Sequence, residues 1–270
     1  MKRFGITLIF CAFSLWLTAQ EYTQVASEIL STGPTKSKSE TILDIAQGFL
    51  GKPYRAATLE KTPEALVFNL NEFDCFTLVE NVMALAMTKH SPESGLDVYK
   101  EYLQLLRYRN GIIDGYGSRM HYFIDWANQA VDNEILLNIT AEIGKEQNKS
   151  IDFMSKNRKL YPALIKDDLA LEQIQNAESE LNERAFFYVP KTSFKEIEEK
   201  IEDGDIVAFT SSISGLDVNH EGFAIWINGK LHLLHASLEE KKVIISKETM
   251  EQYLHRIKKH SGIMVFRVSR

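Results

Sequence analysis

The chain has 270 residues, of which 44% are hydrophobic and 25% are charged, with 14 glycines and only 6 prolines. These values are typical of an ordinary soluble globular protein that is long enough to bury a substantial core. The formal net charge of -6 argues against a polyanion as the binding partner, so we expect no nucleic-acid partner.

The first 20 residues have the pattern of a secretory signal peptide. Lys2 and Arg3 provide a positive start, residues 4–19 are apolar, and polar residues follow from Gln20. The apolar run is shorter than the roughly 20 residues that span a bilayer, which favours cleavage over a retained membrane anchor. We therefore expect residues 21–270 to form one domain that is periplasmic or otherwise exported, without stable membrane insertion.

The leader also decides which cysteines remain. Cys11 lies inside the apolar run and leaves with it, so Cys75 is the single thiol of the mature chain and no internal disulfide can form. Residues 37–50 are expected to form a helix that ends at Gly51, followed by a turn and a loop to about residue 70.

Cys75 stands at the start of the next predicted helix, directly after Asp74. Asp74 can cap this helix, and the free N–H groups and the helix dipole favour negative charge on the sulfur. The placement therefore predicts a reactive thiolate. The alternative is a buried and inert cysteine, because free cysteines are among the most buried residues.

The middle of the chain is expected to be helical. Residues 94–108 form one predicted helix, a glycine-containing loop follows, and a second helix is expected over about 119–130. From about 138 to 183 the chain is polar and charged with weak helical periodicity, which predicts a helical insertion beside the core.

The last third has strand patterns. A helix is predicted at 193–200 and another at 247–257, and strands are predicted at 206–209, 222–227, 230–235, 243–245 and 263–268. Helices therefore come first and an antiparallel sheet second, which is an α+β architecture.

One predicted hairpin assigns three of the histidines to its two faces. With Asn228 and Gly229 as its two loop residues, His220 and His235 lie on one face as diagonal neighbours roughly 7 to 8 Å apart, whereas His232 points to the opposite face. Two such imidazoles can serve as a base for the thiol and as the partner that fixes its tautomer.

The sequence gives less support to roles for the other histidines and to other kinds of catalytic site. His90, His232, His255 and His260 are expected to be ordinary surface or core residues. A zinc site of Cys75, His220 and His235 is an alternative, but no C-x-x-C or H-E-x-x-H spacing supports it. No G-x-S-x-G motif of a serine hydrolase is present. We therefore expect neither a metal nor another cofactor.

Five short motifs, taken in chain order, resemble the NlpC superfamily of papain-like cell-wall cysteine hydrolases. They are Gly51-Lys52-Pro53-Tyr54, Phe73-Asp74-Cys75, Gly204-Asp205-Ile206-Val207, His220-Glu221-Gly222-Phe223-Ala224-Ile225 and Leu234-His235-Ala236. Within that superfamily, residues 73–81 and 118–126 are most similar to the N-acetylmuramoyl-L-alanine amidase-like family. The resemblance covers about residues 40–130 and 185–270.

The resemblance implies a papain-like NlpC-type fold, with the cysteine at a helix N-terminus packed on the sheet. It implies that Cys75 is the nucleophile, that His220 is general base and then acid, and that His235 orients His220.

The resemblance also implies substrate-binding residues. Tyr54 and Asp74 would belong to the substrate cleft, and Arg119 and His121 are candidate substrate contacts, with Arg119 suited to a carboxylate. The alternative for Arg119 and His121 is a role in bracing their loop.

The activity implied is hydrolysis of peptidoglycan fragments at the amide between N-acetylmuramic acid, in its ordinary or anhydro form, and L-alanine, through a thioester. One alternative is a muropeptide endopeptidase that cuts the bond between D-glutamate and the diamino acid. A second is a catalytically silent module that binds the cell wall.

Overall fold

The computed structural model describes residues 23–34 and 37–269. The signal peptide predicted for residues 1–20 lies outside the described residues. None of the helices within the described ranges is both long enough and apolar enough to cross a membrane.

The first half of the chain is helical, as predicted. Its elements are α2 (Lys38–Gly48), α3 (Cys75–His90), α4 (Leu96–Arg107), the short 3-10 turns η1 (Arg109–Gly111) and η2 (Tyr116–Ser118), and α5 (Phe123–Asp132). Helix α3 is the central one, because its residues from Thr77 to Ala86 are all buried. A reciprocal cap formed by Asp74 and Thr77 fixes its start, so the N-terminus of α3 is well defined.

The segment predicted as a helical insertion contains both helices and strands. Its elements are β1 (Leu136–Asn138), α6 (Thr140–Ile143), β2 (Lys145–Gln147), α7 (Phe153–Lys156), η3 (Arg158–Leu160), α8 (Pro162–Ile165) and α9 (Asp168–Asn182). Strands β1 and β2 add to the sheet at β8 and β3, which ties the segment to the rest of the fold. Strands of three residues are too short for a sequence period to predict.

The second half of the chain forms the sheet. Its elements are β3 (Phe186–Pro190), η4 (Lys191–Ser193), α10 (Phe194–Ile197), η5 (Glu198–Lys200), β4 (Ile206–Ser211), β5 (Val218–Ile227), β6 (Lys230–Ser237), β7 (Lys242–Ile245), α11 (Met250–Arg256) and β8 (His260–Val268). The strand order is β2-β3-β8-β4-β5-β6-β7, and every neighbouring pair is antiparallel. The predicted α+β class is confirmed.

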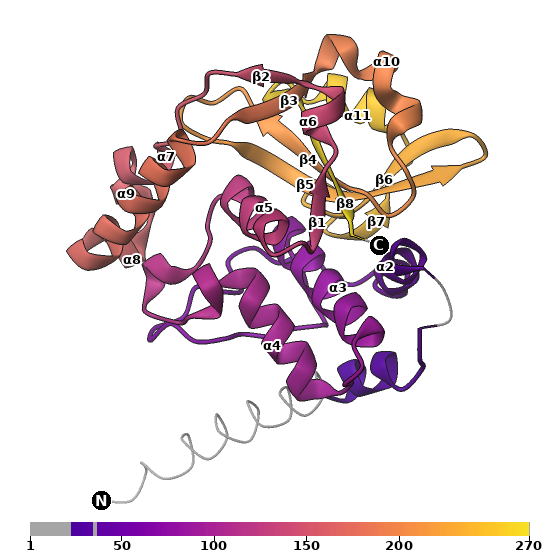
Figure 1. Ribbon diagram of the computed structural model, residues 1–270, viewed down its shortest axis with the longest axis horizontal. Coiled ribbons are helices and arrows are strands. Elements are labelled where there is room, and N and C mark those ends of the chain that lie inside the picture. The colour runs from indigo at the N-terminus through magenta and orange to yellow at the C-terminus, as the bar shows by residue number, and fades with distance from the viewer. Residues whose placement is uncertain (1–22, 35–36, 270) are drawn as a thin grey trace, which may run out of the picture.

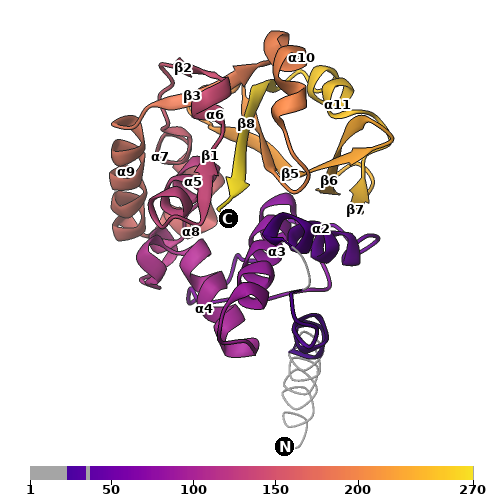
Figure 2. The same cartoon turned by 45° about the vertical axis from the view of Figure 1, so that its right-hand side comes forward.

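The sheet separates two layers of helices (Figure 1). Helices α2 and α3 lie on one side of it, and α10 and α11 lie on the other, an arrangement that Figure 2 shows from a second direction. The two sides have separate apolar cores: Ala208 and Phe223 belong to the core shared with α3, whereas Phe209 and Ala224 belong to the core shared with α11. Alternate residues of each strand thus face different helices.

The hairpin register predicted from the sequence is confirmed. Ile227 pairs with Lys230 and Phe223 pairs with Leu234. Asn228 and Gly229 have positive φ angles of 50° and 73°, which a two-residue hairpin turn of this kind requires.

Candidate active site

Cys75 is the first residue of α3 and is half-buried. The Asp74 carboxylate accepts a hydrogen bond of 2.8 Å from the Thr77 N–H, and the Thr77 hydroxyl oxygen accepts one of 3.0 Å from the Asp74 N–H. The cap expected from the sequence is therefore present, and it orients the first turn of the helix that carries the thiol.

The electrostatic surroundings of Cys75 do not favour the thiolate that the sequence predicts. The pKa of Cys75 is raised well above its usual value, first by burial and then by the negative charges of Glu221 and Asp74. A free thiolate in the substrate-free molecule is therefore the wrong expectation. The helix N-terminus does favour negative charge, but desolvation and two neighbouring carboxyl groups outweigh that effect here.

Glu221 is the site residue that the sequence analysis missed. It lies on β5 opposite Ala208, so it faces α3, and it is only 4% exposed. Burial, followed by the charges of Asp74 and Asp217, raises its pKa to about 8, and Cys75 is among the groups that act on it. A glutamate in the buried middle of a strand, directly after the candidate base His220, was the available signal.

His220 and His235 contact each other as the hairpin register predicted. Nε2 of His220 lies 2.6 Å from Nδ1 of His235, and the two rings are nearly perpendicular at 83°. Burial lowers the pKa of His220 to about 4 and also lowers that of His235. Both imidazoles are thus neutral at neutral pH, so one ring N–H donates to the other ring. His232 donates instead to the Ser246 carbonyl, from the other face of the hairpin.

The histidine pair does not contact the thiol in this structure. His220 lies opposite Phe209 on β4, and its ring packs near Phe209 and Tyr253, on the α11 side of the sheet. Among the described residues, the charge that acts most strongly on the Cys75 thiol is that of Glu221. The charge of Cys75 nevertheless contributes to the raised pKa of Tyr253, whose ring lies near both histidines.

A strand irregularity lies at this position. The pairing of β4 with β5 shifts between Phe209 and Thr210, directly beside His220. Such irregularities re-aim side chains near active sites. The sequence therefore predicted the contact between the histidines, whereas it did not predict this irregularity.

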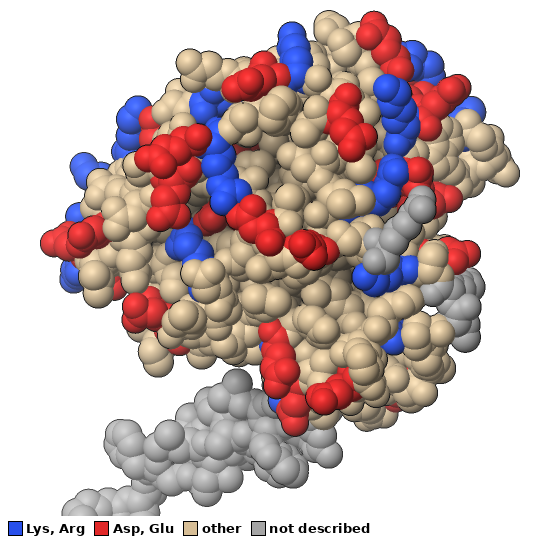
Figure 3. Space-filling model, in the orientation of Figure 1, with Lys and Arg blue, Asp and Glu red and all other residues tan. Residues whose placement is uncertain are grey.

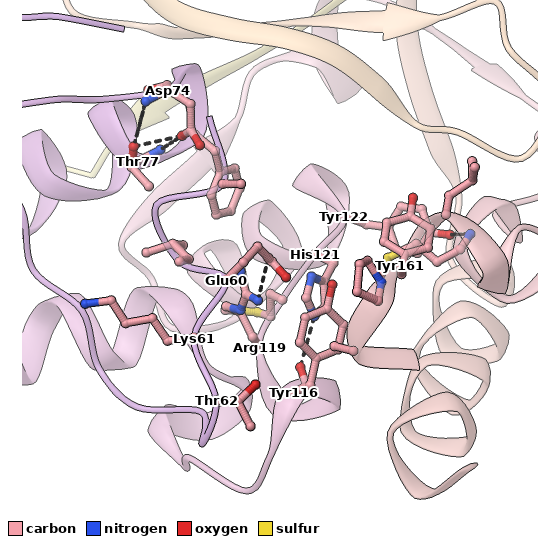
Figure 4. A pocket seen from close by; sticks show the side chains of 18 of the residues that line it. Glu60, Lys61, Thr62, Asp74, Thr77, Tyr116, Arg119, His121, Tyr122 and Tyr161 are labelled. Atoms are coloured by element: carbon pink, nitrogen blue, oxygen red, sulfur yellow. Dashed lines mark hydrogen bonds and ion pairs between the residues drawn. The ribbon is translucent and has the colours of Figure 1, made fainter. Parts of the chain in front are cut away.

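A cavity of about 780 Å³ opens at the start of α3. Asp74 and Thr77 line one side of it, and Tyr116, His121, Tyr122 and Tyr161 line other parts of the wall (Figure 4). The loop at 57–62 and the α7–α8 segment complete the lining. The segment from 138 to 183 thus contributes directly to the cavity wall.

Arg119 and His121 both line this cavity, but the polar groups of each side chain are already held by other residues of the protein. The guanidinium of Arg119 pairs with Glu60 at 2.9 Å and with Glu64 at 3.2 Å, and it lies over the ring of Tyr116. His121 donates from Nε2 to the Tyr116 carbonyl, and burial lowers its pKa to about 3. The charge of Arg119 is therefore already neutralised by two glutamates, which favours a bracing role.

Tyr54 lies near the thiol rather than in the cavity wall. Its backbone pairs with Phe73, two residues before Cys75. Burial, followed by the charges of Cys75 and Asp74, raises the pKa of its hydroxyl to about 12. Tyr54 is thus a protonated hydroxyl close to the sulfur.

The described residues contain no group of three or more His, Cys, Asp or Glu side chains arranged to hold a metal ion. The zinc site considered from the sequence has no geometric counterpart among them. On the face drawn in Figure 3, Lys and Arg side chains are interspersed with Asp and Glu, without a broad patch of one sign.

Comparisons with known proteins agree with the fold. The AmiA-like family model, described as N-acetylmuramoyl-L-alanine amidase-like, matches residues 44–263. A crystal structure of an N-acetylmuramoyl-L-alanine amidase from Bacteroides uniformis is 37% identical, with a TM-score of 0.82, and the match covers 86% of this chain and 99% of that chain.

Two further structures are similar. A protein from Bacteroides fragilis, suggested by its name to be a xylanase, is 39% identical over 84% of this chain and 100% of its own, with a TM-score of 0.78. A protein from Legionella pneumophila, 22% identical over 96% of this chain and 97% of its own with a TM-score of 0.69, shares the fold. No curated protein matches the sequence. The chain therefore belongs to the N-acetylmuramoyl-L-alanine amidase-like family.

Proposed function

We propose that this protein is an exported cysteine hydrolase that cleaves the amide between N-acetylmuramic acid and L-alanine in peptidoglycan fragments. One observation carries the proposal: the single thiol of the predicted mature chain lies at a capped helix start beside a large cavity, in a chain whose family is amidase-like. The order of the cysteine and histidine motifs supports a papain-like NlpC-type arrangement, and the leader pattern supports a periplasmic location.

The reaction would proceed in two steps. His220 takes the thiol proton of Cys75, and the sulfur attacks the lactyl carbonyl carbon. The C–N bond then breaks, and the stem-peptide amine leaves with that proton from His220. Water, activated by the same histidine, then hydrolyses the thioester and releases the sugar carboxylate. The N–H of Cys75, at a helix start where it has no intrahelical partner, can donate to the oxyanion.

The histidine pair has defined roles in this scheme. His235 fixes the tautomer of His220 through their 2.6 Å contact. The scheme requires a thiol–imidazole contact, which would form in the substrate complex.

Substrate recognition would use the cavity at the start of α3. A volume of about 780 Å³ is enough for a sugar together with the first residues of a peptide, and the tyrosines of the wall offer aromatic faces and hydroxyls. Arg119 and His121 would hold the wall in place, while Asp74 and Tyr54 would lie beside the scissile amide. Binding energy from the sugar would then position the amide over Cys75.

A defined muramyl peptide tests the proposal. We expect mass spectrometry to show release of the whole stem peptide beginning with L-alanine, and no cleavage of the same stem without its sugar. Release of an L-alanyl-D-glutamate end instead would establish the endopeptidase alternative. Binding of the fragment without any product, by enzyme whose thiol is reduced, would indicate the silent wall-binding module.

A further inference from the structure

Five aromatic rings from five different elements meet around the histidine pair. They come from β4, β5, β6, α11 and β8, and the residues are Phe209, His220, His235, Tyr253 and His260. The centroids of contacting rings lie 4.8 to 6.2 Å apart, within the range in which aromatic rings attract one another. Ring packing therefore restrains the two imidazoles in addition to the hydrogen bond between them.

Tyr253 is the ring that contacts all four of the others. Its centroid lies 5.9 Å from that of His220, 5.4 Å from that of His235, 5.1 Å from that of Phe209 and 5.6 Å from that of His260. The residue is only 9% exposed. Removal of this one ring would therefore leave a gap beside both imidazoles.

Arg256 anchors the ring of Tyr253. The guanidinium carbon Cζ lies 5.4 Å from the ring centroid, and the guanidinium pairs with Glu239 at 3.0 Å and with Glu248 at 2.6 Å. The two carboxylates keep the cation in place, and a cation near an aromatic ring is attracted to its face. Tyr253 is thus held from α11 as well as from the sheet.

The use of His220 as a base depends on how the two imidazoles are turned. Nε2 of His220 lies 2.6 Å from Nδ1 of His235, so Nδ1 of His220 is the nitrogen left for the thiol proton. This nitrogen can accept a proton only when the shared hydrogen is on Nε2 of His220 and Nδ1 of His235 accepts it. Rotation of either ring about χ2 would break this arrangement.

We propose that Tyr253 is a positioning residue, whose ring holds His220 and His235 in the orientation that proton transfer requires. The proposal rests on the proposed function, in which His220 is the base. The contacts described above are made by the ring of Tyr253, so the ring rather than the hydroxyl has this role. Tyr253 does not line the cavity at the start of α3, so substrate binding there should not depend on it.

Three substitutions test the role of the ring. Tyr253→Leu removes the ring and keeps an apolar side chain, Tyr253→Phe keeps the ring, and Phe194→Leu is the matched control. Phe194 is also buried in the core shared with α11, but it belongs to α10 and has no ring contact with His220 or His235 among the described residues. We would measure kcat and KM for a muramyl peptide with the unsubstituted protein and each folded variant.

We expect Tyr253→Leu to lower kcat by about 10- to 100-fold with little change in KM, because a displaced catalytic group slows the chemical step without weakening binding. Tyr253→Phe and Phe194→Leu should keep the kcat of the unsubstituted protein. An unchanged kcat in folded Tyr253→Leu would overturn the proposal. An equal loss in Tyr253→Phe would overturn it as well, since the hydroxyl would then be responsible, and so would an equal loss in Phe194→Leu, which would indicate general loosening of the core.

NMR spectroscopy tests the same proposal without a substrate. In the unsubstituted protein we expect nuclear Overhauser contacts between the ring protons of Tyr253 and those of both histidines, and imidazole nitrogen shifts that place the hydrogen of His220 on Nε2. In Tyr253→Leu the two tautomers of His220 should become mixed, and a single unchanged tautomer would contradict the proposal.

The ring contacts in the unsubstituted protein provide the test if Tyr253→Leu does not fold. Their absence in solution would overturn the positioning role of Tyr253. Absence of muropeptide cleavage by a protein that shows these contacts would instead reject the proposed function, so the two failures are distinguishable.

Discussion

The proposed chemistry depends on one atom, the sulfur of Cys75. It is the only cysteine among the described residues, and it opens a helix whose start lines the cavity through Asp74 and Thr77. We expect Cys75→Ala to abolish turnover of a muramyl peptide while the unfolding transition stays close to that of the unsubstituted protein, because the residue is half-buried and small. Substantial hydrolysis by the purified variant would exclude a thioester mechanism.

The three histidines of the β5–β6 hairpin allow a matched comparison. We expect His220→Ala to lower kcat by about 10²- to 10⁴-fold, the range typical of a general base, and His235→Ala to lower it less, because His235 acts through His220. His232→Ala is the control, since His232 faces the other side of the hairpin. A folded His232→Ala variant as impaired as His220→Ala would contradict these assignments.

At the scale of elements, the two strands that carry the histidines pack very closely. A Cβ on Gly222 would lie 2.6 Å from the Leu234 carbonyl oxygen and 2.9 Å from the Cβ of His235. Backbone cannot yield as a flexible side chain does, so Gly222→Ala should push β5 and β6 apart and separate the histidine pair.

We expect Gly222→Ala to lower the free energy of unfolding by about 1–3 kcal/mol, the range of overpacking, and to lower kcat as well. Gly48→Ala is the control, because a Cβ there would meet nothing within 4 Å and the residue ends helix α2. Urea denaturation of both variants gives the comparison. Equal stability of the two variants would show that the strand spacing tolerates a methyl group.

Helices α3 and α4 are joined by a buried ion pair. Arg107 and Glu80 are 1% and 0% exposed, and their N–O distance is 2.9 Å. Removing one partner leaves the other charge buried and unpaired, so Glu80→Gln should cost about 3–5 kcal/mol of stability, measured by urea denaturation. A loss below 1 kcal/mol would mean that water or another group compensates Arg107.

At the scale of the whole molecule, ionisation of the buried Glu221 carboxyl lowers the stability of the folded protein as the pH rises. The folded-state pKa of Glu221, about 8, lies above the value of about 4.3 for an exposed glutamate. The folded state therefore binds the proton more tightly than the unfolded state does. The stability that this provides is complete below about pH 4.3 and is lost as the pH rises through about 8.

Replacing the ionisable carboxyl removes that dependence. Relative to the unsubstituted protein, Glu221→Gln should become more stable by up to about 1.4 kcal/mol for each pH unit between about pH 5 and pH 8. Urea denaturation of both proteins at pH 6 and pH 8 measures the change. A stability difference that is constant with pH would mean that Glu221 is ionised in the folded protein throughout this range.

The helices, most strands and the hairpin were predictable, because each follows from local chemistry. The Asp74 cap, the Asn228-Gly229 turn and the alternation of side chains along β5 and β6 act over a few residues, so the pairing of His220 with His235 could be derived from sequence. The order of the motifs indicated the amidase-like family for the same reason, since it is a property of the chain itself.

The protonation of the thiol and the short strands β1 and β2 were decided by tertiary structure alone. The pKa of Cys75 depends on burial and on Glu221, which lies 146 residues away in the chain and meets the thiol only when β5 packs against α3. The charge of Arg119 is likewise neutralised by Glu60 and Glu64, partners that loop packing selects. Local propensity determines where helices and strands form. Desolvation, and interactions between charges far apart in the sequence, arise only after those helices and strands have packed together.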